Sequence, residues 1–345
     1  MSLNPNITEA LLNWYDHNAR ILPWREEPTP YRVWISEIML QQTRVEAVKP
    51  YYERFMKELP DIEALASVDD DKLMKLWEGL GYYNRARNLK IAANQILEEF
   101  EGKMPGDYDK LLTLKGIGEY TAGAIGSIAF GLPVAAVDGN VLRVITRISA
   151  DERDILKQST KRAVTGELLE IIPKDRAGDF NQALMELGAV VCVPNGQPKC
   201  DQCPWDTVCR AYKEDLIGKI PVKTPKKKKR IEQKTVFLLE YQHKIAIRKR
   251  GKKGLLAGLW EFPNEESIFT VEDLEQKLKT WKVAHYHFEA TAKQKHIFSH
   301  VEWHMAGFYI ECLEKPEEDF IWISREEMEE DYAIPSAFEA FKAVL

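Results

Sequence analysis

Two carboxylic acids in the first half of the chain have neighbours that suit proton transfer and the stabilisation of positive charge. Glu37 lies in a helical pattern, and its neighbours one turn away are the apolar residues Val33, Trp34 and Leu40. Apolar surroundings raise the pKa of a carboxyl, which favours a proton donor. Asp138 follows the apolar run VAAV and opens the next helical pattern, where the helix dipole keeps an aspartate ionised. A solvated glutamate and an aspartate that only caps a helix are the plainer alternatives.

A glycine pair lies between these acids, in the segment LLTLKGIGEYTA that begins at Leu111. Gly116 and Gly118 are free to adopt positive φ, so backbone amides can turn outward and meet a phosphate at the start of the helix that opens near Glu119. A lone GxG is usually only a turn. With Asp138 downstream, the layout suits gripping DNA and attacking a sugar.

Four of the five cysteines cluster in one short stretch, at Cys192, Cys200, Cys203 and Cys209. Four thiolates separated by seven, two and five residues suit a [4Fe-4S] cluster, and a structural zinc site is the competing interpretation. A disulfide framework does not suit a chain of this size. Cys312 lies in a β-type run and is expected to be an ordinary core thiol.

Composition and charge describe an ordinary globular chain with one basic stretch. The 345 residues are 45% hydrophobic and 30% charged, which suggests two or three domains. The net charge is −6, but residues 219–253 hold 14 Lys and Arg against 2 Asp and Glu, a net of +12 that leaves −18 for the remainder. No apolar run approaches the roughly 20 residues that span a bilayer. The N-terminus lacks a signal-peptide pattern, so we expect a cytoplasmic protein with no membrane partner.

The elements that must position these residues change in type along the chain. Residues 1–218 read as successive helices, which predicts an all-α domain, with helical patterns at 10–15, 31–42, 45–56, 70–77, 85–100, 121–129, 140–148, 160–171 and 177–191. Residues 219–230 contain a proline- and lysine-rich run without apolar periodicity, which predicts a basic linker. Residues 231–345 combine β-type runs with a helix at 272–279 and another near the C-terminus, which predicts an α+β domain.

The motifs LLTLKGIGEYTA, VDGN and WISEIMLQQTRVEAVKPYY together resemble the helix-hairpin-helix base-excision glycosylases, in particular the A/G-specific adenine DNA glycosylase (MutY) family. The resemblance covers nearly the whole chain. It implies that Glu37 protonates the target adenine and that Asp138 stabilises or captures the sugar cation, with help from Asn140 and Tyr120. Enzymes similar to endonuclease III have a lysine where this chain has Tyr120, so the resemblance implies no strand-cleaving lyase step.

The same resemblance implies which residues contact DNA. The adenine pocket of the family corresponds here to Trp24, Arg25, Leu40, Val45, Gln182 and Met185. Its other DNA-binding positions correspond to Gln42, Thr43, Leu80, Tyr82, Gly116 and Gly118. Gln42 and Tyr82 would enter the base stack and fill the gap left by an extruded nucleotide. Taken singly, each pocket residue is more often part of a core.

The C-terminal part resembles family domains that inspect 8-oxoguanine on a Nudix-like fold. The segment FSH, preceded by His296, matches their recognition loop, so His296, Phe298 and Ser299 are expected to read the N7–H and O8 edge of 8-oxoguanine. The segment GLLAGLWEFPN also resembles Nudix hydrolases, but no glutamate-rich box follows it, so the fold is expected without magnesium chemistry. The four cysteines are expected to hold the [4Fe-4S] cluster, although the family's usual first interval is six residues and not seven.

The resemblance therefore implies a multidomain, monofunctional DNA repair glycosylase. Its partner would be double-stranded DNA containing adenine opposite 8-oxoguanine or guanine, its product an abasic site, and its state a monomer. A bifunctional glycosylase/lyase for oxidised pyrimidines and a mispair-binding protein without catalysis are the two alternatives.

Overall fold

The computed structural model describes residues 6–225, 228–291 and 293–345, so Lys226 and Lys227 of the expected linker lie outside the described residues. The chain divides into two compact units, residues 1–67 with 87–225 and residues 68–86 with 226–345. Among the described residues, no helix is long and apolar enough to cross a membrane. The sequence-based domain bounds at 218 and 231 remain a prediction.

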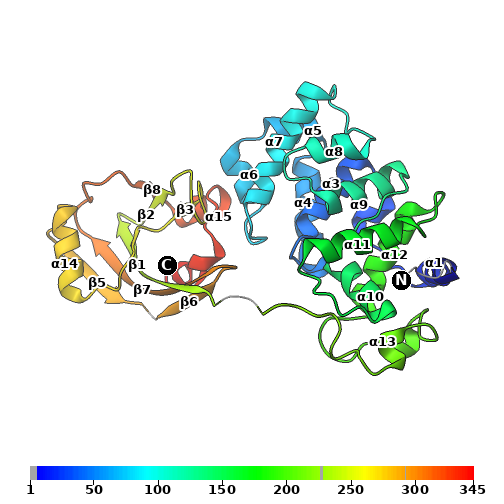
Figure 1. The fold of residues 1–345 in the computed structure, drawn as a ribbon. Coiled ribbons are helices and arrows are strands. Elements are labelled where there is room, and N and C mark those ends of the chain that lie inside the picture. Colours follow the sequence, from blue (N-terminus) through cyan, green and yellow to red (C-terminus); the bar gives the residue numbers. More distant parts are fainter. Residues whose placement is uncertain (1–5, 226–227, 292) are drawn as a thin grey trace. The chain divides into compact units, whose positions relative to one another are not determined.

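The first unit is all-α, as the helical patterns predict (Figure 1). Its helices are α1 Asn6–Asn18, α2 Pro23–Glu26, α3 Pro30–Leu40, α4 Val45–Glu58, α5 Ile62–Ser67, most of α7 Asn84–Glu99, α8 Tyr108–Thr113, α9 Glu119–Phe130, α10 Gly139–Ser149, α11 Gln158–Leu169, α12 Ala177–Val190 and α13 Arg210–Lys213, with a 3₁₀ turn η1 at Cys200–Gln202. One core joins α1, α10, α11 and α12, and its fully buried side chains include Leu11, Ile145, Val164, Phe180 and Leu184.

The glycine segment forms a tight turn between α8 and α9. Gly116 has φ +80°, and a Cβ there would lie 2.8 Å from Cβ of Asn88, so both its conformation and its space require glycine. Gly118 is the N-cap of α9 with φ −101°, an ordinary extended value. Only one of the two glycines therefore uses the left-handed conformation that the sequence suggests for both.

An extended segment between α9 and α10 is held against the helices by Asn181 of α12. The Asn181 side chain accepts a hydrogen bond from Ala136 N at 2.9 Å and donates one to the Val134 carbonyl at 2.8 Å. Gly123 of α9 lets this segment approach closely, because a Cβ on Gly123 would lie 2.2 Å from the Ala135 carbonyl oxygen. The apolar run 134–137 before Asp138 is therefore extended and mostly buried, and it is not part of a helix. This run is called the strap below.

The second unit is α+β, as predicted. Its strands are β1 Arg230–Tyr241, β2 Lys244–Lys249, β3 Trp260–Glu261, β4 Asn264–Glu265, β5 Tyr286–Ala290, β6 Gln294–Ile297, β7 Val301–Cys312 and β8 Ile321–Ile323, and its helices are α6 Asp70–Leu76, α14 Val271–Thr280, α15 Arg325–Glu330 and α16 Glu339–Lys342, with a 3₁₀ turn η2 at Ser336–Phe338. The main strand order is β3-β2-β1-β7-β5, with β1 and β7 parallel.

Helices cover both faces of this sheet, and Figure 1 draws α14 and α15 on opposite sides of it. Val236 and Leu238 of β1 pack with residues of α15, η2 and α16, whereas Phe237 and Leu239 pack with residues of α14. Because successive side chains of a strand point to opposite faces, a strand buried on both faces needs the unbroken apolar run VFLL.

Residues 68–86 join the second unit through polar contacts that the sequence does not reveal. Lys75 Nζ donates to the carbonyl oxygens of Met328 and Tyr332 at 3.1 and 3.2 Å. Asp71 Oδ1 lies 2.7 Å from Lys249 Nζ and accepts a hydrogen bond from the Trp260 indole at 3.1 Å.

The close approach at Gly123 leads to a stability prediction. Gly123→Ala is expected to destabilise the protein by about 3 kcal/mol or more, because the new methyl group meets backbone that cannot rotate away. Gly166→Ala in α11 is the control, since a Cβ there meets nothing within 4 Å. It is expected to stabilise the protein by about 0.5–1 kcal/mol. Urea unfolding of both variants is the measurement, and equal midpoints would contradict the prediction.

Candidate active site

The packing of α3 against α9 brings Glu37 and Tyr120 together. Glu37 is 6% exposed, and its carboxyl accepts a short hydrogen bond from the Tyr120 hydroxyl. The same hydroxyl lies 3.4 Å from the Met185 sulfur of α12. Burial raises the pKa of Tyr120 well above its ordinary value, so the phenol stays protonated and acts as a donor. Glu37, which the sequence assigns to catalysis, and Met185, which it assigns to the adenine pocket, therefore contact the same Tyr120 hydroxyl.

The surroundings of Glu37 favour a protonated carboxyl near neutral pH. The pKa of Glu37 is raised to about 7, mainly by burial; the hydrogen bond from Tyr120 and the charge of Arg25 lower it, and the charge of Asp138 adds to the rise. The apolar neighbours in the sequence predict this direction. A carboxyl with such a pKa can both release and accept a proton at neutral pH.

Asp138 is the N-cap of α10. Its carboxylate accepts hydrogen bonds from Val141 N at 2.7 Å and from Asn140 Nδ2 at 2.8 Å. Burial outweighs the hydrogen bonds and raises the pKa of Asp138 above its ordinary value. The ionised state that the sequence predicts for this helix end stays a prediction.

A buried arginine connects this carboxylate with the first cysteine of the cluster. Arg143 is 4% exposed and donates to Asn140 Oδ1 at 2.9 Å, to the Gly188 carbonyl at 2.8 Å and to the Cys192 carbonyl at 2.9 Å. Sequence reasoning missed Arg143. Its position three residues after Asn140, one turn along α10, is the signal that could have found it.

Arg25, assigned to the pocket, is the centre of a second polar network. It donates to Gln182 Oε1 at 3.1 Å and lies 2.9 Å from Glu186 Oε2, a carboxylate whose side chain is only 1% exposed. Arg20 Nε contacts the other oxygen of Glu186 at 2.5 Å. Sequence reasoning missed Arg20 and Glu186, although Glu186 follows Gln182 by one helical turn of α12.

The remaining pocket and DNA-binding positions of the first unit lie close together in the chain. Trp24 is buried with its ring 5.4 Å from the Tyr52 ring. The half-buried side chains of Leu40 and Val45 end α3 and begin α4. Between them, Gln42 is exposed with φ +60°, and Thr43 is half-buried. A positive φ in a residue other than glycine is uncommon and often marks a functional turn.

Within the second unit, the structure brings a predicted wedge and a predicted recognition residue together. Tyr82 is 48% exposed with φ +48°, and its hydroxyl lies 2.8 Å from Ser299 Oγ. Phe298 contacts the His296 ring at a centroid distance of 4.5 Å. Leu80 is buried and does not reach the surface. The β-type run at residues 296–313 is not one continuous strand, because the turn that holds Ser299 separates β6 from β7.

The four cysteines of the cluster segment are half-buried thiols, and Cys192 and Cys203 pack against the core of the first unit. Burial, and then the neighbouring Cys192, Cys209 and Cys200, raise the pKa of Cys203 to about 12. Arg147 Nη1 lies 3.3 Å from the Cys192 sulfur. Across residues 6–225, 228–291 and 293–345, no group of three or more His, Cys, Asp or Glu is arranged as a metal site. The donor set of four thiols is nevertheless the one that an iron-sulfur cluster uses.

Comparison with known proteins identifies the family. Residues 35–174 match the HhH-GPD superfamily of base excision DNA repair proteins, and residues 235–343 match the NUDIX domain. The chain is 34% identical to the adenine DNA glycosylase of Schizosaccharomyces pombe over 396 aligned positions, which cover 93% of this chain and 85% of that relative. The chain belongs to the adenine DNA glycosylase family.

One further sequence relative and one solved structure show which parts of this glycosylase are similar to known proteins. It is 35% identical to the Homo sapiens adenine DNA glycosylase, but the alignment covers only 64% of the human protein and 85% of this chain. The solved structure of a non-covalent endonuclease III–DNA complex has a TM-score of 0.53 and 25% identity, and covers 62% of this chain and 99% of that one. The protein is therefore a DNA glycosylase with a helix-hairpin-helix domain and a Nudix-like domain.

The raised pKa of Glu37 predicts a pH-dependent stability. Because the folded-state pKa is about 7, above the ordinary 4.5, the contribution of protonated Glu37 is fully present below about pH 4 and is lost as the pH rises through 7. Glu37→Gln stays neutral, so its melting temperature relative to the native glycosylase is expected to rise between pH 5 and pH 8. Glu98→Gln, at an exposed position of α7, is the control for the loss of one charge. A difference that does not change with pH would contradict the expectation.

Proposed function

We propose that this glycosylase excises adenine opposite 8-oxoguanine, or more weakly opposite guanine, from double-stranded DNA by hydrolysis of the N-glycosidic bond. The observation that carries the proposal is a pair of acids, a buried, protonatable Glu37 held by Tyr120 and a half-buried Asp138 held by Asn140. A purine leaves as an anion unless it is protonated, and the sugar it leaves becomes a cation. The two acids supply what each fragment needs.

The reaction begins when Glu37 donates its proton to N7 of adenine. The electron pair of the N-glycosidic bond then moves onto the base, and the positive charge on the sugar ring is stabilised by the Asp138 carboxylate or captured by it in a covalent bond. Asn140 orients that carboxylate. A water molecule adds to C1′ and gives a proton to Glu37, which restores the acid and leaves an abasic site.

The absence of a lysine at position 120 supports a monofunctional reaction. A phenol hydroxyl cannot form the Schiff base that leads to strand cleavage. Tyr120 instead donates to Glu37, which fixes the orientation of that carboxyl. Arg25, which is held by Glu186, and Gln182, which accepts a hydrogen bond from Arg25, are proposed to bind adenine with Trp24 and Met185.

Base extrusion is proposed to use exposed positions in each of the two units. The turn at Gly116 and Gly118 ends at the start of α9, where free backbone amides suit a phosphate. Gln42 and Tyr82 are exposed and have positive φ, which suits side chains that enter the base stack. Extrusion costs a few kcal/mol, roughly, and least at a mispair, which contributes to selectivity.

Recognition of the opposite base is proposed for the turn at Phe298–His300. Ser299 is exposed, and a hydroxyl both donates and accepts hydrogen bonds, so it can match the N7–H and O8 edge of 8-oxoguanine. A Nudix-type hydrolysis of nucleotides is the weaker candidate. Glu261 lies within the segment that resembles Nudix hydrolases, but it is 3% exposed and forms ion pairs with Arg248 and Arg250.

We propose that Cys192, Cys200, Cys203 and Cys209 hold a [4Fe-4S] cluster. The cluster would supply structural linkage of the C-terminal part of the first unit and positive charge that keeps the thiols deprotonated. Arg143 would connect the Cys192 backbone to the Asn140 that orients Asp138.

The catalytic proposal is tested by single-turnover excision on a duplex with adenine opposite 8-oxoguanine. Asp138→Asn is expected to lower the rate by about 10²- to 10⁴-fold without loss of DNA binding, because asparagine still caps α10 but carries no charge. Asp107→Asn is the matched control, since Asp107 caps α8 through Lys110 N at 3.0 Å. Substantial turnover by Asp138→Asn would sink the assignment, and a covalent adduct trapped by borohydride would favour the lyase alternative.

The cluster proposal is tested by elemental analysis of the anaerobically purified protein. Four iron and four sulfide ions per chain, with visible absorption from sulfide-to-iron charge transfer, are the expected result. Cys200→Ser is expected to lower the iron content, whereas Cys312→Ser is expected to leave it unchanged. One zinc ion per chain in a colourless protein would overturn the proposal in favour of the structural zinc site.

A further inference from the structure

Trp303 occupies a fixed position directly behind the turn proposed to read 8-oxoguanine. It lies on β7, pairs in register with Glu232 of β1 on one side and with His296 of β6 on the other, and is 1% exposed. The turn itself is narrow, because Phe298 N donates to the Val301 carbonyl at 2.9 Å. The indole is therefore the interior support of this turn.

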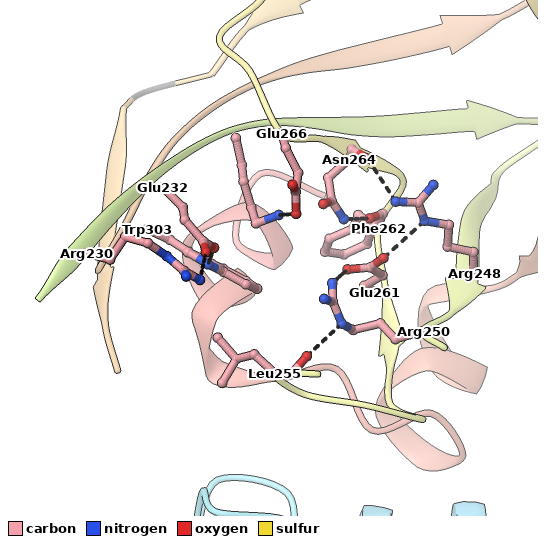
Figure 2. A network of polar contacts seen from close by, with 11 residues as sticks. Arg230, Glu232, Arg248, Arg250, Leu255, Glu261, Phe262, Asn264, Glu266 and Trp303 are labelled. Carbon is pink, nitrogen blue, oxygen red and sulfur yellow. Dashed lines mark hydrogen bonds and ion pairs between the residues drawn. The ribbon is translucent and has the colours of Figure 1, made fainter. Parts of the chain in front are cut away.

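A carboxylate fixes the orientation of the indole. Trp303 Nε1 donates to Glu232 Oε2 at 2.8 Å, and Arg230 donates to the other oxygen of the same carboxylate. Figure 2 shows Arg230, Glu232 and Trp303 joined in this line of polar contacts. A buried N–H that loses its acceptor is costly, so the indole cannot turn freely while Glu232 is present.

Two cations and an aromatic ring contact the indole. Lys234 Nζ lies 4.7 Å and Arg250 Cζ 5.7 Å from the Trp303 ring centroid, and the Lys234 side chain is only 2% exposed. The Phe298 ring packs edge-on against Trp303, with centroids 4.8 Å apart and an interplanar angle of 69°. The orientation of Phe298 thus depends on that of Trp303, because edge-to-face contacts are directional.

We propose that Glu232 and Trp303 are positioning residues for the Phe298–His300 turn and set how strongly the glycosylase distinguishes 8-oxoguanine from guanine opposite adenine. The inference rests on the proposed function. The two bases differ there by one oxygen and one N–H, so a hydroxyl that separates them has to be held to within about 0.5 Å. Rotation of the indole would move Phe298, and Ser299 follows Phe298 directly.

The test measures single-turnover excision and duplex affinity for adenine opposite 8-oxoguanine and opposite guanine, with the full-length protein. Glu232→Leu removes the acceptor. The preference for 8-oxoguanine, which is the excision rate opposite 8-oxoguanine divided by that opposite guanine, is expected to fall about fivefold to tenfold, and this quotient is called the ratio below. Glu232→Gln keeps an oxygen acceptor for Trp303, so it is expected to restore most of the ratio. A residue needed only for folding would not give this rescue.

The same two strands provide a matched control. Glu240 of β1 accepts a hydrogen bond from the Tyr309 hydroxyl of β7 at 2.8 Å, at the other end of the strand pair. Glu240→Leu removes an equivalent carboxylate–aromatic bond far from the turn, and the ratio is expected to stay at the native value. A loss as large as that of Glu232→Leu would overturn the inference in favour of a general effect on the sheet.

The outcomes separate the inference from the function on which it rests. A native protein with no preference for 8-oxoguanine contradicts the proposed function. A native preference that Glu232→Leu retains overturns the inference alone. If Glu232→Leu does not fold, Trp303→Phe decides, because it keeps an aromatic ring beside Phe298 and removes the N–H: a lowered ratio supports the inference, and a native ratio overturns it.

Discussion

A carboxyl group held away from water is the constraint on which the candidate site of the first unit depends. Glu37 is buried where α3 meets α9, and the charge of Asp138 opposes its ionisation. The Tyr120 hydroxyl compensates by donating to Glu37. The proposed reaction needs both groups, a carboxyl with a pKa of about 7 as the acid for the base and a helix-capping aspartate as the anion for the sugar.

The backbone on both sides of Asp138 is held by contacts with other helices. Asn181 holds the strap that leads to Asp138, and Gly123 lets the strap lie against α9. Beyond Asp138, Arg143 continues the hydrogen bonds from Asn140 to the backbone of Cys192. The cysteine segment and the N-terminal end of α10 therefore share one buried donor, Arg143.

The second unit meets a similar requirement with different chemistry. Its sheet has apolar side chains on both faces, and the buried Glu261 is paired with Arg248 and Arg250 (Figure 2). Trp303 lies where such a network meets an exposed turn. A rigid interior contact of this kind limits how far a surface loop can relax, and a loop that discriminates similar bases benefits from that limit.

The sequence by itself determined the helical and α+β character of the two parts, the raised pKa of Glu37 and the cap at Asp138. These follow from local periodicity and neighbouring side chains. Only the tertiary structure decided that residues 68–86 pack with the C-terminal part, that Tyr120 bonds to Glu37, that burial raises the pKa of Asp138, and that Glu186 and Arg143 hold the site residues. Such contacts join residues distant in the chain, and desolvation depends on everything packed around a group, so no local pattern reports them.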